Sequence, residues 1–449
     1  MLKRLFSVIL IAGLAIIGQA QPPTQPVTDK LDEFLSVTAR LNKFNGVALV
    51  AKDGEILLHK GYGWRDAQRR VMHDENSIFQ IGSVTKQFTS VIILYLEEQG
   101  KLSVQDNLSK YIPGYPNGDK ITIRHLLTHT SGIFNYTNDN AFMATEAVNP
   151  IAAEKLIAVF KDKPLDFEPG SQYRYSNSGY ILLGYIIEKV SGKPYEQMVR
   201  ELIFRPLQMR NSGFDFKALR SHGKSTGYFV LSNDTMPAPI VDSSVSYAAG
   251  SIYSTAADLY KWHQSLFTEK LLRKSSLQKA FTPFRNKYGY GWVIDSIENK
   301  RVIMHNGGIF GFTSDMWRAP ADSVCIILLS NKPDELGTIT RNLFSIIYGK
   351  PYAIPVERKA IKLPESILRQ YIGEYELSST FKIVITLEDG QLKGQPTGQG
   401  KFDLFAERED FFFVKFVDAQ LKFIRGADGK VEQFILQQGG GSQPAKKIK

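Results

Sequence analysis

The stretch Ile81-Gly82-Ser83-Val84-Thr85-Lys86 opens an apolar segment that continues to Gln99 and stops at Gly100. Apolar side chains occupy nearly every face of a helix drawn from Val84 to Gln99, which is the pattern of a helix buried on all sides. Glycine is favoured just past helix C-termini because it adopts left-handed backbone angles readily. The stretch therefore predicts a buried helix that opens at Ser83.

Ser83 and Lys86 are three residues apart, so one helix face carries both side chains. A serine hydroxyl becomes a good nucleophile only when a neighbouring group takes its proton. Burial pushes a lysine toward its neutral amine, which can accept that proton. The Ser83 backbone N–H, at the positive end of the helix dipole, would stabilise an oxyanion. The same tetrad also fits an N-capping serine with a solvated lysine, so its interpretation depends on other elements.

Three other elements accompany the tetrad. They are Ile121-Thr-Ile-Arg-His-Leu-Leu-Thr-His-Thr-Ser-Gly132, Tyr175-Ser176-Asn177 and His305-Asn306-Gly307-Gly308. In this order and spacing they resemble the serine β-lactamases and penicillin-binding proteins, from about Asp32 to Tyr348. The Tyr-x-Asn element is similar to that of class C β-lactamases and the related DD-peptidases and esterases.

The resemblance implies roles for two residues of the Tyr-x-Asn element. Tyr175 would lie beside Ser83 as a phenolate-like general base, kept partly ionised by Lys86, and would later protonate the leaving group. Asn177 would bind the substrate amide and help to fix Lys86. Because Lys86 and Tyr175 would titrate together, their catalytic roles are those of a coupled pair.

The resemblance also implies that the third element lines the substrate site. Gly307 would let its strand approach the substrate backbone closely. The backbone N–H groups of Gly308 and Ser83 would form an oxyanion hole. The family carries Lys-Thr-Gly or His-x-Gly at this position. His305 and Asn306 replace the lysine and threonine of the commoner pattern, whose threonine helps to bind a substrate carboxylate. A neutral imidazole attracts an anion less than a lysine does, so we expect weaker carboxylate recognition here.

Other signals favour structural roles. His125 and His129 lack the His-Glu-x-x-His arrangement of a zinc site, so we expect them to pack near the site rather than bind a metal. Cys325 lies in an apolar run that predicts a buried strand. The block Ala248–Asp258, which resembles a family segment near the active site, is assigned a structural role. No cofactor is expected, and the Gly-x-Ser-x-Gly elbow of α/β-hydrolases does not occur.

Strand-forming runs lie near both ends of this region, with helix-rich sequence between them. An Asp-Gly turn at 53–54 joins the runs Gly46–Ala51 and Glu55–His59 as a hairpin. The other expected elements are helices at Leu31–Leu41 and Ile339–Ile347 and strands at Tyr288–Ile294, Arg301–His305, Phe312–Trp317 and Val324–Leu329. These runs predict an α+β fold, with an antiparallel sheet closed by distant parts of the chain and a helical subdomain. The resemblance implies the β-lactamase/transpeptidase-like arrangement of such elements.

The length of 449 residues allows more than one domain. We expect a signal peptide at 1–20, the hydrolase domain at 21–350, a proline-bearing linker at 351–364 and a C-terminal domain at 365–449. The last segment contains β-type runs and Asp-Gly turns at 389–390 and 428–429. This texture predicts a small all-β, barrel-like domain.

The first residues have the features of a secretory signal. Lys3 and Arg4 precede an apolar run from Leu5 to Ile17, and small residues follow near Ala20. The run is too short to span a membrane, so we expect cleavage and no stable membrane insertion. No cysteine follows it, which argues against a lipid anchor. We therefore expect a periplasmic or secreted protein.

The sequence favours an exported serine hydrolase that acts through an acyl-enzyme on Ser83. Its expected substrates are D-amino-acid peptides, as for a DD-carboxypeptidase, including peptidoglycan fragments. An esterase or amidase, or a class C-like β-lactamase acting on β-lactams, is an alternative within the family. A non-catalytic envelope-binding protein is an alternative of another class. The formal charge of +10 is scattered along the chain, so no nucleic-acid partner is expected.

Overall fold

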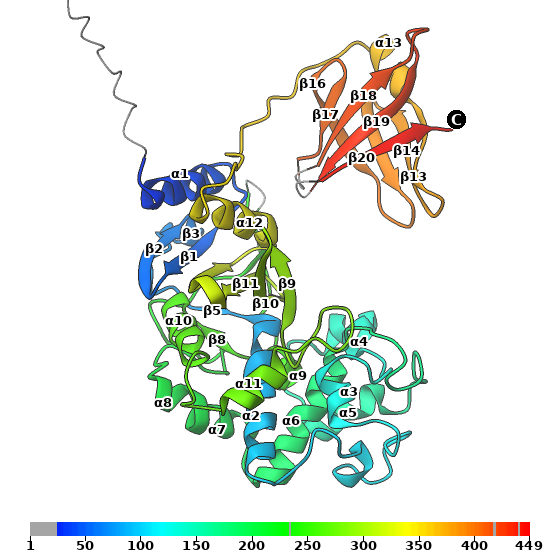
Figure 1. Ribbon diagram of the computed structural model, residues 1–449. Coiled ribbons are helices and arrows are strands. Elements are labelled where there is room, and N and C mark those ends of the chain that lie inside the picture. Colours follow the sequence, from blue (N-terminus) through cyan, green and yellow to red (C-terminus); the bar gives the residue numbers. More distant parts are fainter. Residues whose placement is uncertain (1–24, 233–234, 416–418, 439–440) are drawn as a thin grey trace, which may run out of the picture.

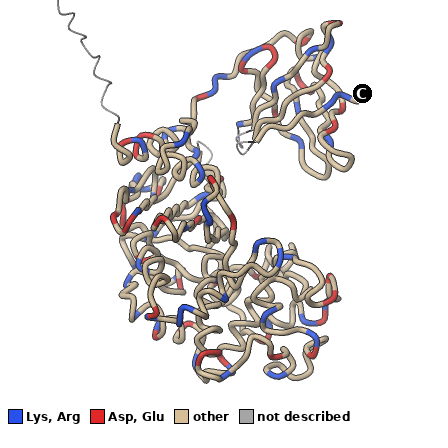
Figure 2. The backbone as a smooth tube through the Cα atoms, in the orientation of Figure 1, with Lys and Arg blue, Asp and Glu red and all other residues tan. Residues whose placement is uncertain are grey.

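The computed structural model describes residues 25–232, 235–415, 419–438 and 441–449. The expected signal peptide at residues 1–20 lies outside this part of the chain. The described residues form an α+β body and a closed β-barrel (Figure 1). Basic and acidic residues are interspersed along both bodies (Figure 2). Among the described residues, no helix combines the length and the apolar character needed to cross a bilayer.

The centre of the first body is a six-stranded antiparallel sheet with the strand order β2-β1-β12-β11-β10-β9. Its strands are β1 (Gly46–Lys52), β2 (Glu55–Tyr62), β9 (Val293–Ile297), β10 (Lys300–Ile309), β11 (Phe312–Ala319) and β12 (Val324–Ser330). Gly46 lies opposite Ser330, so strands from distant parts of the chain pair at the centre. This confirms the predicted sheet, and Cys325 is fully buried within β12 as predicted.

The predicted strand at Tyr288–Ile294 is wrong over most of its length, because β9 begins only at Val293. Gly291 has a φ of +83°, which takes the backbone out of extended geometry. A Cβ atom at Gly291 would lie 2.8 Å from the carbonyl oxygen of Lys86. The glycine-rich segment therefore packs tightly against the helix that carries Lys86 instead of extending the sheet.

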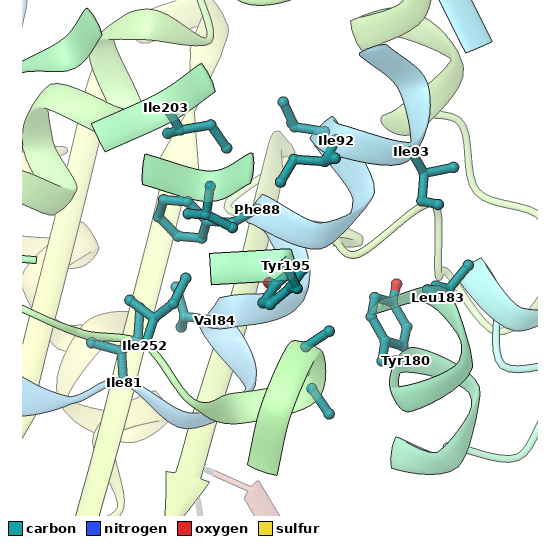
Figure 3. Packing of buried hydrophobic residues seen from close by; sticks show 14 of the residues in the cluster. Ile81, Val84, Phe88, Ile92, Ile93, Tyr180, Leu183, Tyr195, Ile203 and Ile252 are labelled. Atoms are coloured by element: carbon teal, nitrogen blue, oxygen red, sulfur yellow. The ribbon is translucent and has the colours of Figure 1, made fainter. Parts of the chain in front are cut away.

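Helix α2 (Thr85–Glu98) runs through the interior, as the sequence predicts. Figure 3 shows its side chains among those of neighbouring elements. The Phe88 ring stacks on Trp262 with 4.3 Å between centroids and meets Phe204 edge-on at 6.0 Å. Close packing on all sides leaves the first turn of α2 little freedom to move.

Different helices cover the two faces of the sheet. Ala48 belongs to a core cluster with residues of α1 (Val27–Arg40) and α12 (Leu336–Ile347). Its neighbour Val47 belongs to the cluster that contains α2. This alternation is what a strand buried on both faces requires, since successive side chains point to opposite sides. Both outer helices confirm the predictions for their regions.

Short helices and hairpins complete the first body. The helices are α3 (Ile123–Leu127), α4 (Asn140–Thr145), α5 (Ala153–Lys161), α6 (Asn177–Ser191), α7 (Tyr195–Val199), α8 (Arg205–Leu207), α9 (Ser243–Gly250), α10 (Ala256–Ser265) and α11 (Lys274–Ala280). The small antiparallel pairs are β3 (Trp64–Asp66) with β4 (Val71–Met72), β5 (Phe79–Gln80) with β8 (Tyr253–Ser254), and β6 (Tyr228–Val230) with β7 (Met236–Pro237).

The C-terminal segment forms a closed barrel, which confirms the predicted all-β domain. Its elements are α13 (Glu365–Leu368), β13 (Gly373–Ser378), β14 (Phe381–Glu388), β15 (Gln391–Pro396), β16 (Phe402–Arg408), β17 (Phe411–Phe413), β18 (Ala419–Arg425), β19 (Val431–Gln438) and β20 (Gly441–Lys447). Aromatic side chains such as Tyr375, Phe423 and Phe434 fill its interior, as expected for a barrel this small. Residues 351–360 join the two bodies without a helix or strand.

Candidate active site

Three separate elements bring the predicted catalytic residues together. Ser83 lies in a single turn of 3₁₀-helix, Gly82–Val84, immediately before α2, and Lys86 lies in the first turn of α2. Tyr175 lies in the loop before α6, and Asn177 is the first residue of that helix. Ser83, Tyr175 and Asn177 are each partly exposed, so a substrate can reach them. The buried α2 and α6 hold this arrangement in place.

Lys86 is fully buried and has no acidic partner in the described chain. Its Nζ lies 2.9 Å from the Ser83 Oγ, 2.8 Å from the Asn177 Oδ1 and 2.8 Å from the carbonyl oxygen of Ala249. Loss of solvation lowers the pKa of Lys86 well below the usual lysine value. Burial therefore favours the neutral amine, as the sequence predicts.

A neutral amine has two hydrogens and one lone pair. The three partners of Lys86 determine which of them each partner contacts. The Asn177 Oδ1 and the Ala249 carbonyl oxygen can only accept hydrogen bonds. They take both hydrogens, so the lone pair is left for the Ser83 hydroxyl. Lys86 is thus oriented to accept the proton of Ser83 rather than to donate one.

Tyr175 is hydrogen-bonded to the Ser83 hydroxyl. Loss of solvation raises the pKa of Tyr175 above its usual value, and this effect outweighs the bond to Ser83. Lys86 is also near the Tyr175 ring, with its Nζ 4.9 Å from the centroid, but a neutral amine does not stabilise a phenolate. The expected partly ionised Tyr175 is therefore wrong for the free site. A protonated phenol can instead donate its proton to a leaving group.

Asn177 fixes Lys86, which confirms part of its predicted role. Besides the contact with Lys86, its Nδ2 donates to the Thr137 Oγ1 at 3.1 Å. Its backbone N–H donates to the Asn135 Oδ1 at 2.9 Å. These bonds set the orientation of the side-chain amide. Binding of a substrate amide by Asn177 remains a prediction.

The block Ala248–Asp258 does more than the sequence predicts. Within α9, Tyr247 has a φ of 35° and a ψ of −130°, which kinks the helix. Past this kink, the Ala248 carbonyl accepts from the Thr89 Oγ1 at 2.7 Å and the Ala249 carbonyl accepts from Lys86. The contact is made by a backbone oxygen, so no side-chain type at Ala249 could have signalled it.

The two glycines of the third element differ in how closely they are packed. A Cβ atom at Gly307 would lie 2.1 Å from the Ile81 carbonyl oxygen and 2.4 Å from the Ser314 Oγ. Gly307 therefore makes room for the segment that leads into Ser83, and its predicted approach to the substrate stays a prediction. A Cβ atom at Gly308 would meet no atom within 4 Å. The backbone of Gly308 lies against Gly82, which places it beside the nucleophile.

His305 is buried and bonded within the protein, so its predicted contact with the substrate stays a prediction. It is 2% exposed, and its Nδ1 lies 2.6 Å from the Asn306 carbonyl oxygen, which can only accept a hydrogen bond. The Nε2 must therefore accept from the Tyr288 hydroxyl at 2.8 Å. Burial, with a smaller effect of Lys86, lowers the pKa of His305 to about 3. Asn306 is exposed on β10 and remains a predicted substrate contact.

His125 and His129 take structural positions, as predicted. The His125 Nδ1 accepts from the Thr122 backbone N–H at 3.2 Å and closes the N-terminal cap of α3. The His129 ring packs on Tyr175 with 4.1 Å between centroids, and its Nδ1 accepts from the Ser176 N–H at 3.2 Å. Burial lowers the pKa of His129 well below its usual value, so the ring supports Tyr175 as a neutral group.

Known proteins share both bodies of this chain. Residues 36–344 match the family model described as Beta-lactamase, and residues 357–447 match a domain of unknown function, DUF3471. Penicillin-binding protein 4* of Bacillus subtilis (strain 168) is 30% identical over 447 residues, which covers 93% of this chain and 98% of that protein. The match to Penicillin-binding protein 4* extends through the barrel, so both bodies occur together in that protein as well.

Two solved structures are similar to this one. The octameric penicillin-binding protein homologue from Pyrococcus abyssi has a TM-score of 0.68 and 25% identity, over 93% of this chain and 99% of that one. A D-stereospecific amidohydrolase from Streptomyces sp. has a TM-score of 0.60 and 27% identity, over 67% of this chain and 93% of that one.

The two glycines of β10 provide a matched pair of variants. Gly307→Ala should lower the free energy of unfolding by about 1–3 kcal/mol and reduce Ser83 reactivity, because the new methyl group displaces the Ile81 segment. Gly308→Ala should leave both nearly unchanged. Chemical denaturation and labelling with a fluorophosphonate would measure the two effects. Equal behaviour of the two variants would contradict the packing role of Gly307.

Because the pKa of His305 is low, the preference of the site for a substrate carboxylate should not change with pH in the neutral range. His305 takes up a proton only as the pH falls toward its pKa of about 3, so it stays neutral from about pH 8 to pH 5. The KM ratio of two substrates that differ only in a free carboxylate should therefore stay constant over this range. A preference for the carboxylate that grows toward pH 5 would show that His305 becomes a cation.

Proposed function

This chain belongs to the Beta-lactamase family, the serine hydrolases that include the penicillin-binding proteins, and we propose that it cleaves amide or peptide bonds of D-amino acids. The proposed reaction passes through an acyl-enzyme on Ser83. The proposed location is outside the cytoplasm, because Lys3, Arg4 and the apolar run to Ile17 have the features of a signal peptide.

Acylation in this proposal starts from the contacts that Lys86 and Tyr175 each make with the Ser83 hydroxyl. The Ser83 proton passes to the lone pair of Lys86 while the Ser83 Oγ attacks the substrate carbonyl carbon. The N–H groups of Ser83 and Gly308 stabilise the oxyanion that forms. Tyr175 then gives its proton to the leaving nitrogen as the C–N bond breaks. Lys86 then passes the proton that it took from Ser83 to the Tyr175 phenolate. Both groups are neutral again at the end of acylation.

Deacylation reverses the same proton path. A water molecule attacks the acyl carbon and loses a proton to the neutral Lys86, either directly or through Tyr175. Lys86 and Tyr175 thus act as one pair in this step. The Ser83 Oγ leaves with a proton from that pair, and the free acid is released. The site returns to its neutral starting state without any external proton carrier.

The uncharged environment of His305 is the observation that carries the proposed substrate class. With both ring nitrogens bonded inside the protein, the third element offers no cation to a free C-terminal carboxylate. This supports amides and internal peptide bonds over the C-terminal residue of a peptide. The D-configuration is supported by the similarity to the Streptomyces D-stereospecific amidohydrolase.

Covalent binding of penicillins is a second candidate activity. It is supported by the 30% identity to Penicillin-binding protein 4*, which covers nearly all of both chains. Penicillins carry a carboxylate, so the neutral His305 should make this acylation slow. Penicillin would then label Ser83 less readily than a neutral reagent does.

Intact-protein mass spectrometry and turnover together test the proposed function. A fluorophosphonate should add one group to the protein but none to Ser83→Ala, and D-amino-acid amides should be cleaved much faster than their L-enantiomers. Ser90→Ala, on the same helix but away from the nucleophile, is the matched control and should be labelled normally. No labelling, or equal rates for both enantiomers, would refute the proposal.

Tyr175→Phe should separate amide from ester hydrolysis. An amide nitrogen needs a proton in order to leave, and general acid catalysis of such a step contributes about 10²–10⁴-fold. An activated ester leaves without that proton. The variant should therefore lose kcat on a D-amino-acid amide by about that factor while keeping most of its acylation by a nitrophenyl ester. Equal losses on both substrates would contradict the assigned role of Tyr175.

A further inference from the structure

A second pocket, outside the Ser83 site, lies between the β3–β4 hairpin and the segment 221–227. Its volume is about 370 Å³. Its walls are Arg65, Asp66, Arg69, Val71, Ser221, His222, Lys224, Ser225, Thr226, Gly227, Ala238 and Ile240. None of these residues takes part in the proposed catalysis, and polar side chains predominate in the walls.

Cations outnumber acids in the walls of this pocket. Arg65, Arg69 and Lys224 contribute positive charge from both sides, and Asp66 is the acid among the lining residues. Arg65 is paired with Asp74 at 2.6 Å, so one of the three charges is compensated nearby. Arg69 is 83% exposed and its Nε lies 3.7 Å from Asp66, which is too long for a hydrogen bond.

Lys224 keeps its ammonium group without an acidic hydrogen-bond partner. Its Nζ donates to the carbonyl oxygens of Lys217 at 3.1 Å and Leu219 at 3.4 Å. Partial burial, together with the nearby Arg220, lowers the pKa of Lys224 from its usual value. Asp215 acts in the opposite direction and raises this pKa, so the nearby negative charge compensates the ammonium group only in part.

Ser225 provides an independent sign of a missing ligand. It is 2% exposed, and its hydroxyl has no hydrogen-bond partner among the described residues. Its backbone N–H donates to the Ile78 carbonyl oxygen at 3.1 Å, so the residue is held rigidly in the wall of the pocket. Ser225 is one of the residues that line the pocket, and buried hydroxyls in native proteins are nearly always bonded, so its hydroxyl lacks an acceptor among the described residues.

The pocket is connected to the catalytic site through the backbone on two sides. Ile78, whose carbonyl oxygen accepts a hydrogen bond from the Ser225 backbone N–H, is five residues before Ser83. On the other side, a Cβ atom at Gly311 would lie 2.8 Å from the carbonyl carbon of Gly227. Gly311 follows Gly308 by three residues, so their Cα atoms are at most about 11 Å apart.

We propose that this pocket binds a phosphate group. A phosphate has several acceptor oxygens and is bound by guanidinium, ammonium and hydroxyl donors, which are the groups that Arg69, Lys224 and Ser225 provide. The volume exceeds that of a single phosphate, so the group belongs to a larger molecule such as a phosphodiester or phosphomonoester. This molecule is either the acyl part of the substrate or a separate ligand.

Binding of inorganic phosphate to the full chain tests the site itself, without any turnover. Isothermal titration at constant ionic strength should show saturable binding. Arg69→Gln should weaken it by about 10-fold or more, because a charge-assisted hydrogen bond is lost. Arg70→Gln, which removes the same charge from the next residue outside the pocket, should leave the affinity unchanged.

Ser225→Ala gives a second test that does not depend on charge. Without phosphate, this variant should be at least as thermally stable as the wild type, because it removes an unpaired hydroxyl. With phosphate, its melting temperature should rise less than that of the wild type. No saturable binding, or the same affinity in the wild type, Arg69→Gln and Ser225→Ala, would overturn the proposal.

A kinetic comparison distinguishes the two sources of the phosphate and rests on the proposed function. Two D-amino-acid amides would be used, identical except for a phosphate group on the acyl arm. A lower KM for the phosphorylated amide that disappears in Arg69→Gln assigns the phosphate to the substrate. Equal KM values, with phosphate still bound in the titration, assign it to a separate ligand. Failure of catalysis would leave the titration unaffected, so the two proposals fail separately.

Discussion

The arrangement of this protein depends on a lysine amine that is buried without a counter-charge. Lys86 is surrounded by the packed side chains of α2 and its neighbours, and this burial lowers its pKa and favours the neutral amine with its free lone pair. Two obligate acceptors, the Asn177 Oδ1 and the Ala249 carbonyl oxygen, then fix the direction of that lone pair. The kink at Tyr247 and the start of α6 at Asn177 supply these acceptors from different parts of the chain.

The same burial keeps the rest of the site uncharged. Loss of solvation raises the pKa of Tyr175 and lowers the pKa values of His129 and His305. These shifts all favour neutral groups in the free site, and in the proposed reaction the oxyanion is the charge that the backbone N–H groups of Ser83 and Gly308 would stabilise. Preorganised donors in a poorly solvated site stabilise such a charge strongly, because little reorganisation is needed during the reaction. A neutral site also has little attraction for a substrate carboxylate.

The β-sheet holds the nucleophile in register with its oxyanion donors. β10 brings Gly307 against the Ile81 carbonyl and Gly308 against Gly82, so the strand and the turn before α2 fit closely. β1 and β12 pair at the centre of this sheet although they come from opposite ends of the domain. Catalytic geometry in this fold thus requires the whole domain to be formed.

The sequence by itself determined the class of fold and predicted the residues that the structure brings together around Ser83. The β-type runs follow from strand periodicity, whereas the tetrad and the Tyr-x-Asn element were identified by their resemblance to the family. Side-chain identity also sufficed for the buried α2 and for the β-barrel. Only the tertiary structure decided the protonation of Tyr175, the inward bonding of His305, the backbone contact of Ala249 and the turn at Gly291. Each of these depends on desolvation or on contacts between segments distant in the sequence, and no local pattern encodes such contacts.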